Sequence, residues 1–110
     1  MILNGGTFNK QRILSRKSVE LMTVDHLGSI EFPRTNGVGF GLGFAIVKDL
    51  GKRGTLGSEG EFGWGGAYHS TYWVDPKEDL VVVYFTQLIP AKNIDDQQKL
   101  RSLIYQGIID

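Results

Sequence analysis

The stretch that decides the fold runs from Gly60 to Gln87 and reads GEFGWGGAYHSTYWVDPKEDLVVVYFTQ. Gly63, Gly65 and Gly66 interleave with its aromatic residues. So many large rings in a short segment indicate a covered sheet face, either as core or as one wall of a pocket. Glycine on such a strand marks a place where another backbone or a ligand comes close. The aromatic residues of the stretch are Phe62, Trp64, Tyr68, Tyr72, Trp73, Tyr84 and Phe85.

The same stretch predicts consecutive strands. We expect one over 62–66, a second within 67–74, and a third over 80–88. Residues 75–79 form a turn, with Pro76 at the second position of a type I turn. Because 80–88 is almost continuously apolar, we expect that strand to be buried on both faces.

Upstream, residues 1–6 resemble the last turn of a helix followed by its glycine stop. A helix is predicted to begin at Ser15, a good N-cap, with Leu14 and Val19 placed as a hydrophobic staple. Val19, Met22 and Leu27 would share its buried side, and Gly28 would end it. Residues 28–39 read as a loop.

Residues 40–47 are predicted to form a strand, in a region where glycines alternate with apolar residues. Residues 51–60 read as a polar, glycine-rich loop. A final helix is expected from about 95 to 109, with one apolar stripe made of Leu100, Leu103, Ile104 and Ile108. The fold class is therefore α+β: a small antiparallel sheet packed with helices, forming a single domain over residues 1–110.

Composition excludes several classes of function. Apolar residues make up 41% of the 110 residues, which argues against disorder, and 12 basic residues balance 12 acidic ones. This balance supplies no global field for nucleic acid or an anionic membrane, and no apolar run is long enough to span a bilayer. Without cysteine there is neither a disulfide nor a thiolate metal site.

The sequence has no convincing motif for a catalytic serine, a metal site or a dinucleotide site. Neither Ser-x-x-Lys nor Gly-x-Ser-x-Gly occurs, and the two histidines, His26 and His69, lie far apart without a metal-ligand pattern. The glycine run 37–43 lacks Gly-x-Gly-x-x-Gly spacing and leads into a strand pattern, so it does not indicate a dinucleotide loop. We therefore expect no metal and no other cofactor.

A more specific resemblance comes from Gly63-Trp64-Gly65-Gly66-Ala67, then Tyr72-Trp73-Val74-Asp75-Pro76, Leu80-Val81-Val82-Val83 and Thr86-Gln87. Together with Leu3-Asn4-Gly5-Gly6, Phe40-Gly41-Leu42-Gly43-Phe44 and Leu103-Ile104-Tyr105-Gln106, their order resembles the end of a serine β-lactamase-like domain. That family includes class C β-lactamases, D-Ala-D-Ala carboxypeptidases and related esterases. The likeness covers nearly the whole chain but only about the last third of the family's domain. It implies a partial β-lactamase/transpeptidase-like fold, the C-terminal fragment of such a domain.

The resemblance also implies a site. The family's third cleft motif falls on Trp64-Gly65-Gly66, its oxyanion-hole N–H on Ala67, and Tyr68 and His69 would line the cleft. The Ser-x-x-Lys nucleophile and the Tyr-x-Asn base are absent, and we expect both to lie upstream of Met1. Tryptophan in place of the lysine of Lys-Thr-Gly removes the cation that would hold a β-lactam carboxylate.

From these residues and the resemblance we expect one of two functions. The first is the C-terminal portion of a serine hydrolase, inactive alone, whose ligand is a small ester or amide. The alternative is a non-catalytic module derived from that family, which self-associates or binds a ligand through an exposed aromatic sheet, with a homodimer as the favoured assembly. Full-length relatives are often periplasmic or secreted, but this sequence carries no signal-peptide pattern.

Overall fold

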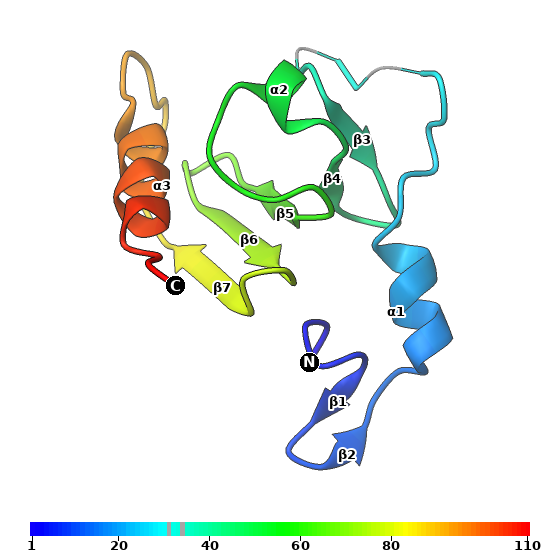
Figure 1. Cartoon of the computed structure of the whole chain (residues 1–110). Helices are drawn as coiled ribbons and strands as arrows, with labels where there is room; N and C mark the ends of the chain where they lie inside the picture. The colour runs from blue at the N-terminus through cyan, green and yellow to red at the C-terminus, as the bar shows by residue number, and fades with distance from the viewer. Residues whose placement is uncertain (31, 34) are drawn as a thin grey trace.

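The computed structural model describes residues 1–30, 32–33 and 35–110. Its main feature is an antiparallel sheet in which every strand pairs with its neighbours in sequence, in the order β3-β4-β5-β6-β7 (Figure 1). A separate small hairpin near the N-terminus joins β1 to β2. The class predicted from the sequence, an α+β fold with a small antiparallel sheet, is confirmed. The elements are β1 Thr7–Phe8, β2 Gln11–Arg12, α1 Arg16–Met22, β3 Val38–Phe40, β4 Ala45–Val47, α2 Leu50–Arg53, β5 Phe62–Gly65, β6 Thr71–Asp75, β7 Leu80–Tyr84 and α3 Asp96–Gln106.

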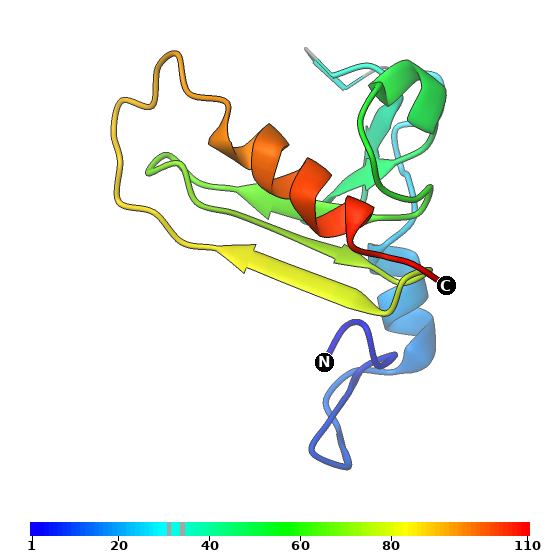
Figure 2. The ribbon, with the colours of Figure 1, turned by 60° about the vertical axis from the view of Figure 1, so that its left-hand side comes forward.

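The two faces of the sheet are covered differently. Ile46, Phe62 and Val74 are cross-strand partners and form the buried apolar cluster on one face, against which Ile2 and Leu3 of the N-terminal turn pack. Helix α3 crosses the other face (Figure 2). The sheet is thus sandwiched at one end between the N-terminal turn and α3, while the rest of the first face has little cover.

Helix α1 starts as predicted but ends earlier. Ser15 is its N-cap, and the Ser15 side chain accepts the N–H of Ser18 at 2.9 Å. The expected continuation to Gly28 is wrong, because the helix ends at Met22. The Met22 carbonyl accepts the N–H of Leu42, and the N–H of His26 donates to Phe40. Pairing with the β3–β4 hairpin therefore replaces the next helical turn.

The strand predicted over 40–47 is in fact a hairpin. Strands β3 and β4 pair with Phe40 opposite Ala45, and the Gly41 N–H donates to the Phe44 carbonyl at 2.8 Å across the turn. Gly43 has φ of 99°, a conformation that favours glycine. A Cβ at Gly41 would lie 2.2 Å from the Met22 carbonyl oxygen, so the expected close backbone approach does occur here. The predicted loop 51–60 likewise begins inside a short helix, α2.

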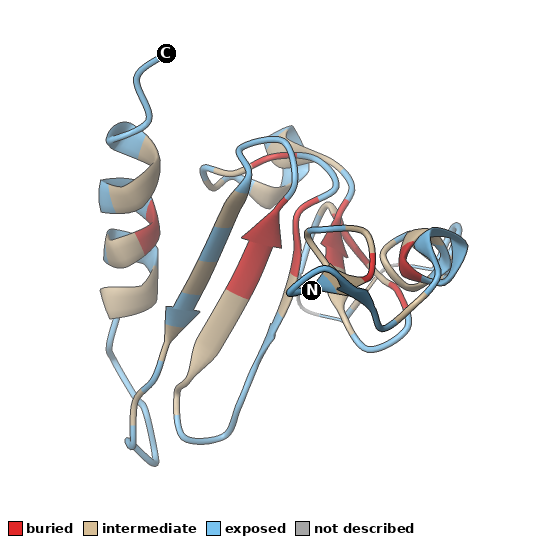
Figure 3. Cartoon of the chain, turned by 90° about the horizontal axis from the view of Figure 1, so that it is seen from below, coloured by how far each residue is buried: buried red, intermediate tan, exposed pale blue. Residues whose placement is uncertain are grey.

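Strands β5, β6 and β7 lie where the sequence predicts, with shorter limits. The expected burial of the third strand on both faces is wrong: Val81 and Val83 are 51% and 54% exposed. Strand β7 is at the end of the strand order, and its exposed and half-buried residues alternate (Figure 3). A continuous apolar run cannot distinguish a central strand from an edge strand that has only one covered face.

The apolar stripe predicted for the last helix is also wrong in detail. Helix α3 spans Asp96–Gln106 rather than 95–109, and the residue it buries is Arg101. Leu103 is 62% exposed, and Ile108 lies beyond the helix. Leu100 and Ile104 of the predicted stripe are half-buried, so the side of α3 toward the sheet carries these two apolar residues together with the buried Arg101. No helix in the described part of the chain has the length and apolar character needed to cross a membrane.

Candidate functional site

The glycine-rich segment lies at the end of β5. Trp64 pairs with Tyr72 and Gly65 with Thr71 in antiparallel register, so the segment belongs to the sheet and not to a helix. Strand β6 lies between β5 and β7 in the sheet, so β5 pairs directly with β6 and not with β7. A Cβ on Gly63 would lie 2.2 Å from the Tyr72 carbonyl oxygen, which requires glycine at this position.

A tight turn joins β5 to β6 at the Trp64–Ala67 end. The Gly66 N–H donates to the Ser70 carbonyl at 2.9 Å, and the His69 N–H donates to the Gly66 carbonyl at 3.1 Å. By contrast, the exposed Ala67 has no hydrogen-bond acceptor for its N–H among residues 1–30, 32–33 and 35–110. An open depression of about 410 Å³ lies here, lined by Trp64, Gly65, Gly66, Ala67, His69, Ser70 and Gln97.

Side chains from α3 and β7 hold this turn. His69, at φ of 66°, places its Nε2 2.6 Å from Asp96 Oδ1, and Asp96 Oδ2 accepts the Tyr84 hydroxyl at 2.9 Å. Gln97 Nε2 donates to the His69 carbonyl at 2.8 Å. The hydrogen bond from His69 lowers the pKa of Asp96, and Asp96 in turn raises the pKa of Tyr84.

The residues expected in the cleft therefore divide into two groups. Trp64, Gly65, Gly66, Ala67 and His69 line the same depression. Tyr68 instead lines a neighbouring depression of about 530 Å³ with Phe85, Thr86 and Gln87, and its carbonyl accepts the Thr86 hydroxyl at 2.6 Å. Sequence spacing did not reveal Asp96 as the partner of His69, because the two are 27 residues apart.

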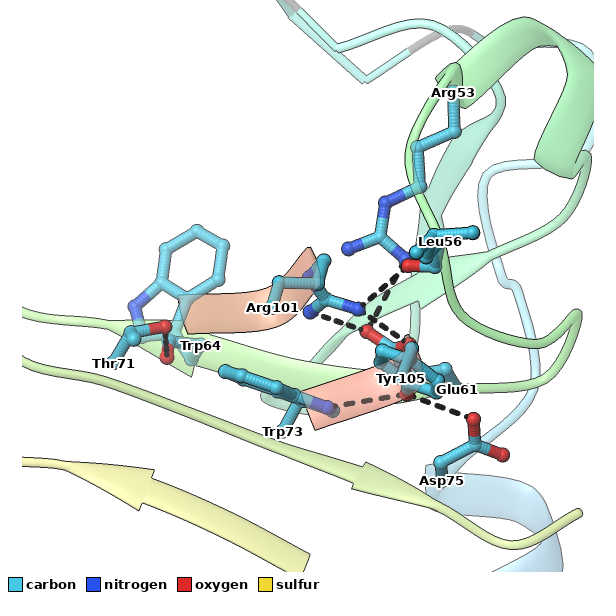
Figure 4. Close-up of polar contacts among 9 residues, drawn as sticks. All are labelled: Arg53, Leu56, Glu61, Trp64, Thr71, Trp73, Asp75, Arg101 and Tyr105. Carbon is cyan, nitrogen blue, oxygen red and sulfur yellow. Dashed lines mark hydrogen bonds and ion pairs between the residues drawn. The ribbon is translucent and has the colours of Figure 1, made fainter. Parts of the chain in front are cut away.

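A buried polar cluster lies beside this segment, beneath α3 (Figure 4). Arg101 donates to both carboxylate oxygens of Glu61 at 2.8 Å, and Arg53 donates to Glu61 Oε1 at 3.1 Å. The Arg101 guanidinium also stacks over Trp73, 4.1 Å from the ring centroid, in a cation–π arrangement.

Tyr105 connects this cluster to a second buried carboxylate. Its hydroxyl oxygen lies 3.0 Å from Glu61 Oε2 and 2.9 Å from Asp75 Oδ2, and accepts the Trp73 indole N–H at 3.2 Å. Burial is the largest cause of the raised pKa of Tyr105. Sequence reasoning missed this cluster. A signal was present in the i, i+4 spacing of Gln97, Arg101 and Tyr105 on α3, which gives the helix a polar stripe.

Known proteins resemble this chain in sequence and in fold. The family model described as Beta-lactamase matches residues 6–103. The "Uncharacterized protein MT1414" of Mycobacterium tuberculosis (strain CDC 1551 / Oshkosh) is 36% identical over 105 residues, covering 86% of this chain and 26% of the relative. "Protein Rv1367c" of M. tuberculosis (strain ATCC 25618 / H37Rv) matches with the same identity and coverage. The structure of "EstCE1, a hydrolase with promiscuous acyltransferase activity" superposes with a TM-score of 0.79 at 28% identity, over 94% of this chain and 26% of that one.

The fold of this chain is thus shared with part of a solved hydrolase structure. This chain belongs to the Beta-lactamase family. It spans 26% of the length of the relatives it matches.

Proposed function

We propose that this chain is the cleft-strand portion of a serine hydrolase of the β-lactamase-like family, and that the Ala67 N–H is one of its oxyanion donors. The observation that carries the proposal is Ala67, an exposed residue in the turn after β5, whose N–H has no hydrogen-bond acceptor in the described part of the chain. An oxyanion hole needs such a fixed donor, because a backbone N–H requires no reorganisation when charge develops.

The remaining machinery is not encoded in these 110 residues. Acyl transfer needs a nucleophile with an adjacent base, and neither Ser-x-x-Lys nor Tyr-x-Asn occurs. We therefore propose that the chain alone turns over no ester, amide or lactam. The relative EstCE1 is a hydrolase with promiscuous acyltransferase activity, and Trp64 stands where lactamases carry lysine. Both points favour a small ester or amide over a β-lactam as the ligand class.

Three probes test the absence of turnover: a short-chain nitrophenyl ester, a chromogenic cephalosporin and a fluorophosphonate. We expect hydrolysis at the buffer rate and no covalent labelling, because a positioned donor without a nucleophile leaves only residual binding effects. Stoichiometric labelling of any serine would contradict this part of the proposal.

Amide hydrogen exchange followed by NMR tests the oxyanion donor itself. The Gly66 N–H is bonded to the Ser70 carbonyl and should exchange slowly, whereas the Ala67 N–H should exchange close to its intrinsic rate. If Ala67 is protected as strongly as Gly66, its N–H is occupied and cannot serve an oxyanion.

A second candidate function is self-association, and one observation favours it. On the face of the sheet away from α3, Val81 and Val83 are about half exposed, and Phe85 beyond the strand is exposed as well. Each 100 Å² of apolar surface left in water costs about 2.5 kcal/mol. Strand β7 also lies at one end of the strand order, with an edge that can pair with another chain. A symmetric dimer would cover both features.

Static light scattering at micromolar concentration tests self-association. A dimer would have about twice the mass of the 12.2 kDa chain. A single-chain mass with no binding of an apolar dye would contradict it.

A further inference from the structure

A further cavity lies on the α3 side of the sheet and has a different character from the depression at Ala67. It has a volume of about 320 Å³. Its walls combine aromatic rings with charged side chains of the buried polar cluster. In the view of Figure 4, Trp64 and Arg53 flank Arg101, all three of which line this cavity. The size is within the lower range of small-molecule sites.

The charges lining this cavity do not balance. The guanidinium groups of Arg53 and Arg101 share a single carboxylate, that of Glu61. Arg101 binds both oxygens of that carboxylate and also donates to the Leu56 carbonyl at 3.1 Å. Among the described residues that line the cavity, basic groups therefore outnumber acidic ones by one.

Of the two arginines that line the cavity, Arg53 is the one with spare hydrogen-bond donors. Its side chain is only 17% exposed, and within the part of the chain that the structure describes its one side-chain hydrogen bond goes from Nη1 to Glu61. A guanidinium carries five N–H donors, arranged as a fork that matches a carboxylate. Burial lowers the pKa of Arg53, and the nearby Arg101 lowers it further, so a second anion would relieve an unfavourable environment.

The other wall of the cavity is aromatic. Phe32 and Trp64 both line it, with ring centroids 6.0 Å apart in an edge-to-face arrangement. The ring of Phe40 packs against both, with its centroid 5.1 Å from that of Trp64 and 5.4 Å from that of Phe32. Such a wall offers a flat apolar surface to a ring or an acyl chain.

We propose that this cavity binds a monocarboxylate carried on an aromatic or apolar body, with Arg53 holding the carboxylate and Trp64 contacting the body. The excess of one basic group among the described lining residues matches a single negative charge, so a carboxylate is favoured over a dianionic phosphate ester. Among the described lining residues, a cationic ligand would meet no carboxylate that is free of an arginine partner. This inference goes beyond the proposed hydrolase function and does not depend on it.

The test is an NMR titration of the chain with 3-phenylpropionate, following the backbone amides and the Trp64 indole N–H. We expect a Kd on the order of 1 mM, appropriate to so small a ligand. The neutral 3-phenylpropionamide should bind at least roughly ten-fold more weakly, because it loses a charge-assisted hydrogen bond. Acetate, which lacks the apolar body, should cause no saturable shift at Trp64. The proposal would be overturned if 3-phenylpropionate and its amide bound equally well, or if phenyl phosphate bound more tightly than 3-phenylpropionate. It would also be overturned if 3-phenylpropionate caused no shift of the Trp64 indole N–H.

Two variants locate the site. Arg53→Gln should weaken 3-phenylpropionate binding at least roughly ten-fold, whereas Lys52→Gln, which removes the same charge from an exposed neighbour, should leave it within about two-fold. If both variants weaken binding equally, the effect is general electrostatics and the assignment fails. Should Arg53→Gln not fold, Trp64→Ala decides, since Trp64 is half exposed and its loss should weaken acid and amide alike.

Discussion

Arg101 on α3 and Glu61, directly before β5, are joined by two hydrogen bonds of 2.8 Å although they are 40 residues apart in sequence. Both residues are nearly inaccessible, at 8% and 2% exposure. Their pairing ties the last helix to the central strand of the sheet. Breaking such a buried pair leaves a charge without a partner, which costs far more than losing a surface ion pair.

Replacing Glu61 with glutamine should therefore lower the free energy of unfolding by about 3 kcal/mol, because Arg53 and Arg101 would then face each other without a counter-ion. Urea denaturation followed by far-UV circular dichroism measures the change. The matched control is Asp95→Asn, which removes an acidic group whose pair with Lys99 is exposed. The control should cost less than about 1 kcal/mol. Equal losses in the two variants would show that the buried pair does not hold α3.

This pair also shows where sequence reasoning fails. Of the predicted stripe, Leu100 and Ile104 are half-buried and Leu103 is exposed, yet the one residue that α3 buries fully is Arg101. Hydrophobic periodicity assumes that the partner surface is apolar. Here the partner surface carries Glu61 and Asp75, and the polar i, i+4 stripe of α3 does not tell which distant residues it pairs with.

Gly63→Ala should destabilise the sheet at β5. The added Cβ would lie 2.2 Å from the Tyr72 carbonyl oxygen and 2.8 Å from the Trp73 Cα, both backbone atoms that cannot rotate away. We expect a loss of about 1–3 kcal/mol in unfolding free energy, typical of overpacking. Thermal unfolding of Gly65→Ala is the comparison, because its Cβ would approach the Ser70 carbonyl oxygen no closer than 3.2 Å. A Gly65 variant as unstable as the Gly63 variant would argue against this explanation.

The positions of the strands were easier to predict from the sequence than their burial or the contacts that they make with α3. The segments at 62–66 and 80–88 and the turn between 75 and 79 follow from local patterns, and the structure places β5, β7 and the Asp75 turn there. The burial of β7 was mispredicted because burial depends on what covers each face. In the candidate site, the resemblance named Trp64–Ala67, but the Asp96 anchor of His69 comes from α3 and only the folded chain brings them together.

Asp25 should make stability pH-dependent under acidic conditions. The hydrogen bond from Lys48 is the largest cause that lowers its pKa, to about 2 from 3.8, with help from the N–H groups of Leu27 and Phe40. A depressed carboxyl pKa contributes stability that is complete above about pH 4 and is lost as the pH falls toward 2. Urea unfolding of wild type and Asp25→Asn from pH 2 to 6 should show a stability difference that shrinks below pH 4.

Lys48→Met provides an independent check on the cause. Removing the 2.8 Å partner of Asp25 should move the carboxyl pKa up toward its ordinary value, as read from the side-chain carbon shift in an NMR titration. An unchanged Asp25 pKa in this variant would assign the effect to the backbone donors instead.

The uncovered face of the sheet leads to a prediction about self-association. Val81 and Val83 project from β7 on the face opposite α3, and both are about half exposed. If this surface joins two chains, Val81→Thr with Val83→Thr should shift the mass seen by light scattering from that of a dimer toward 12.2 kDa. Threonine keeps the β-branched shape and strand preference while adding a polar hydroxyl, so the fold should be retained. Val82→Thr is the control, since Val82 alternates onto the α3 side and should alter stability but not association. An assembly that dissociates equally in the Val82 variant would place the interface elsewhere.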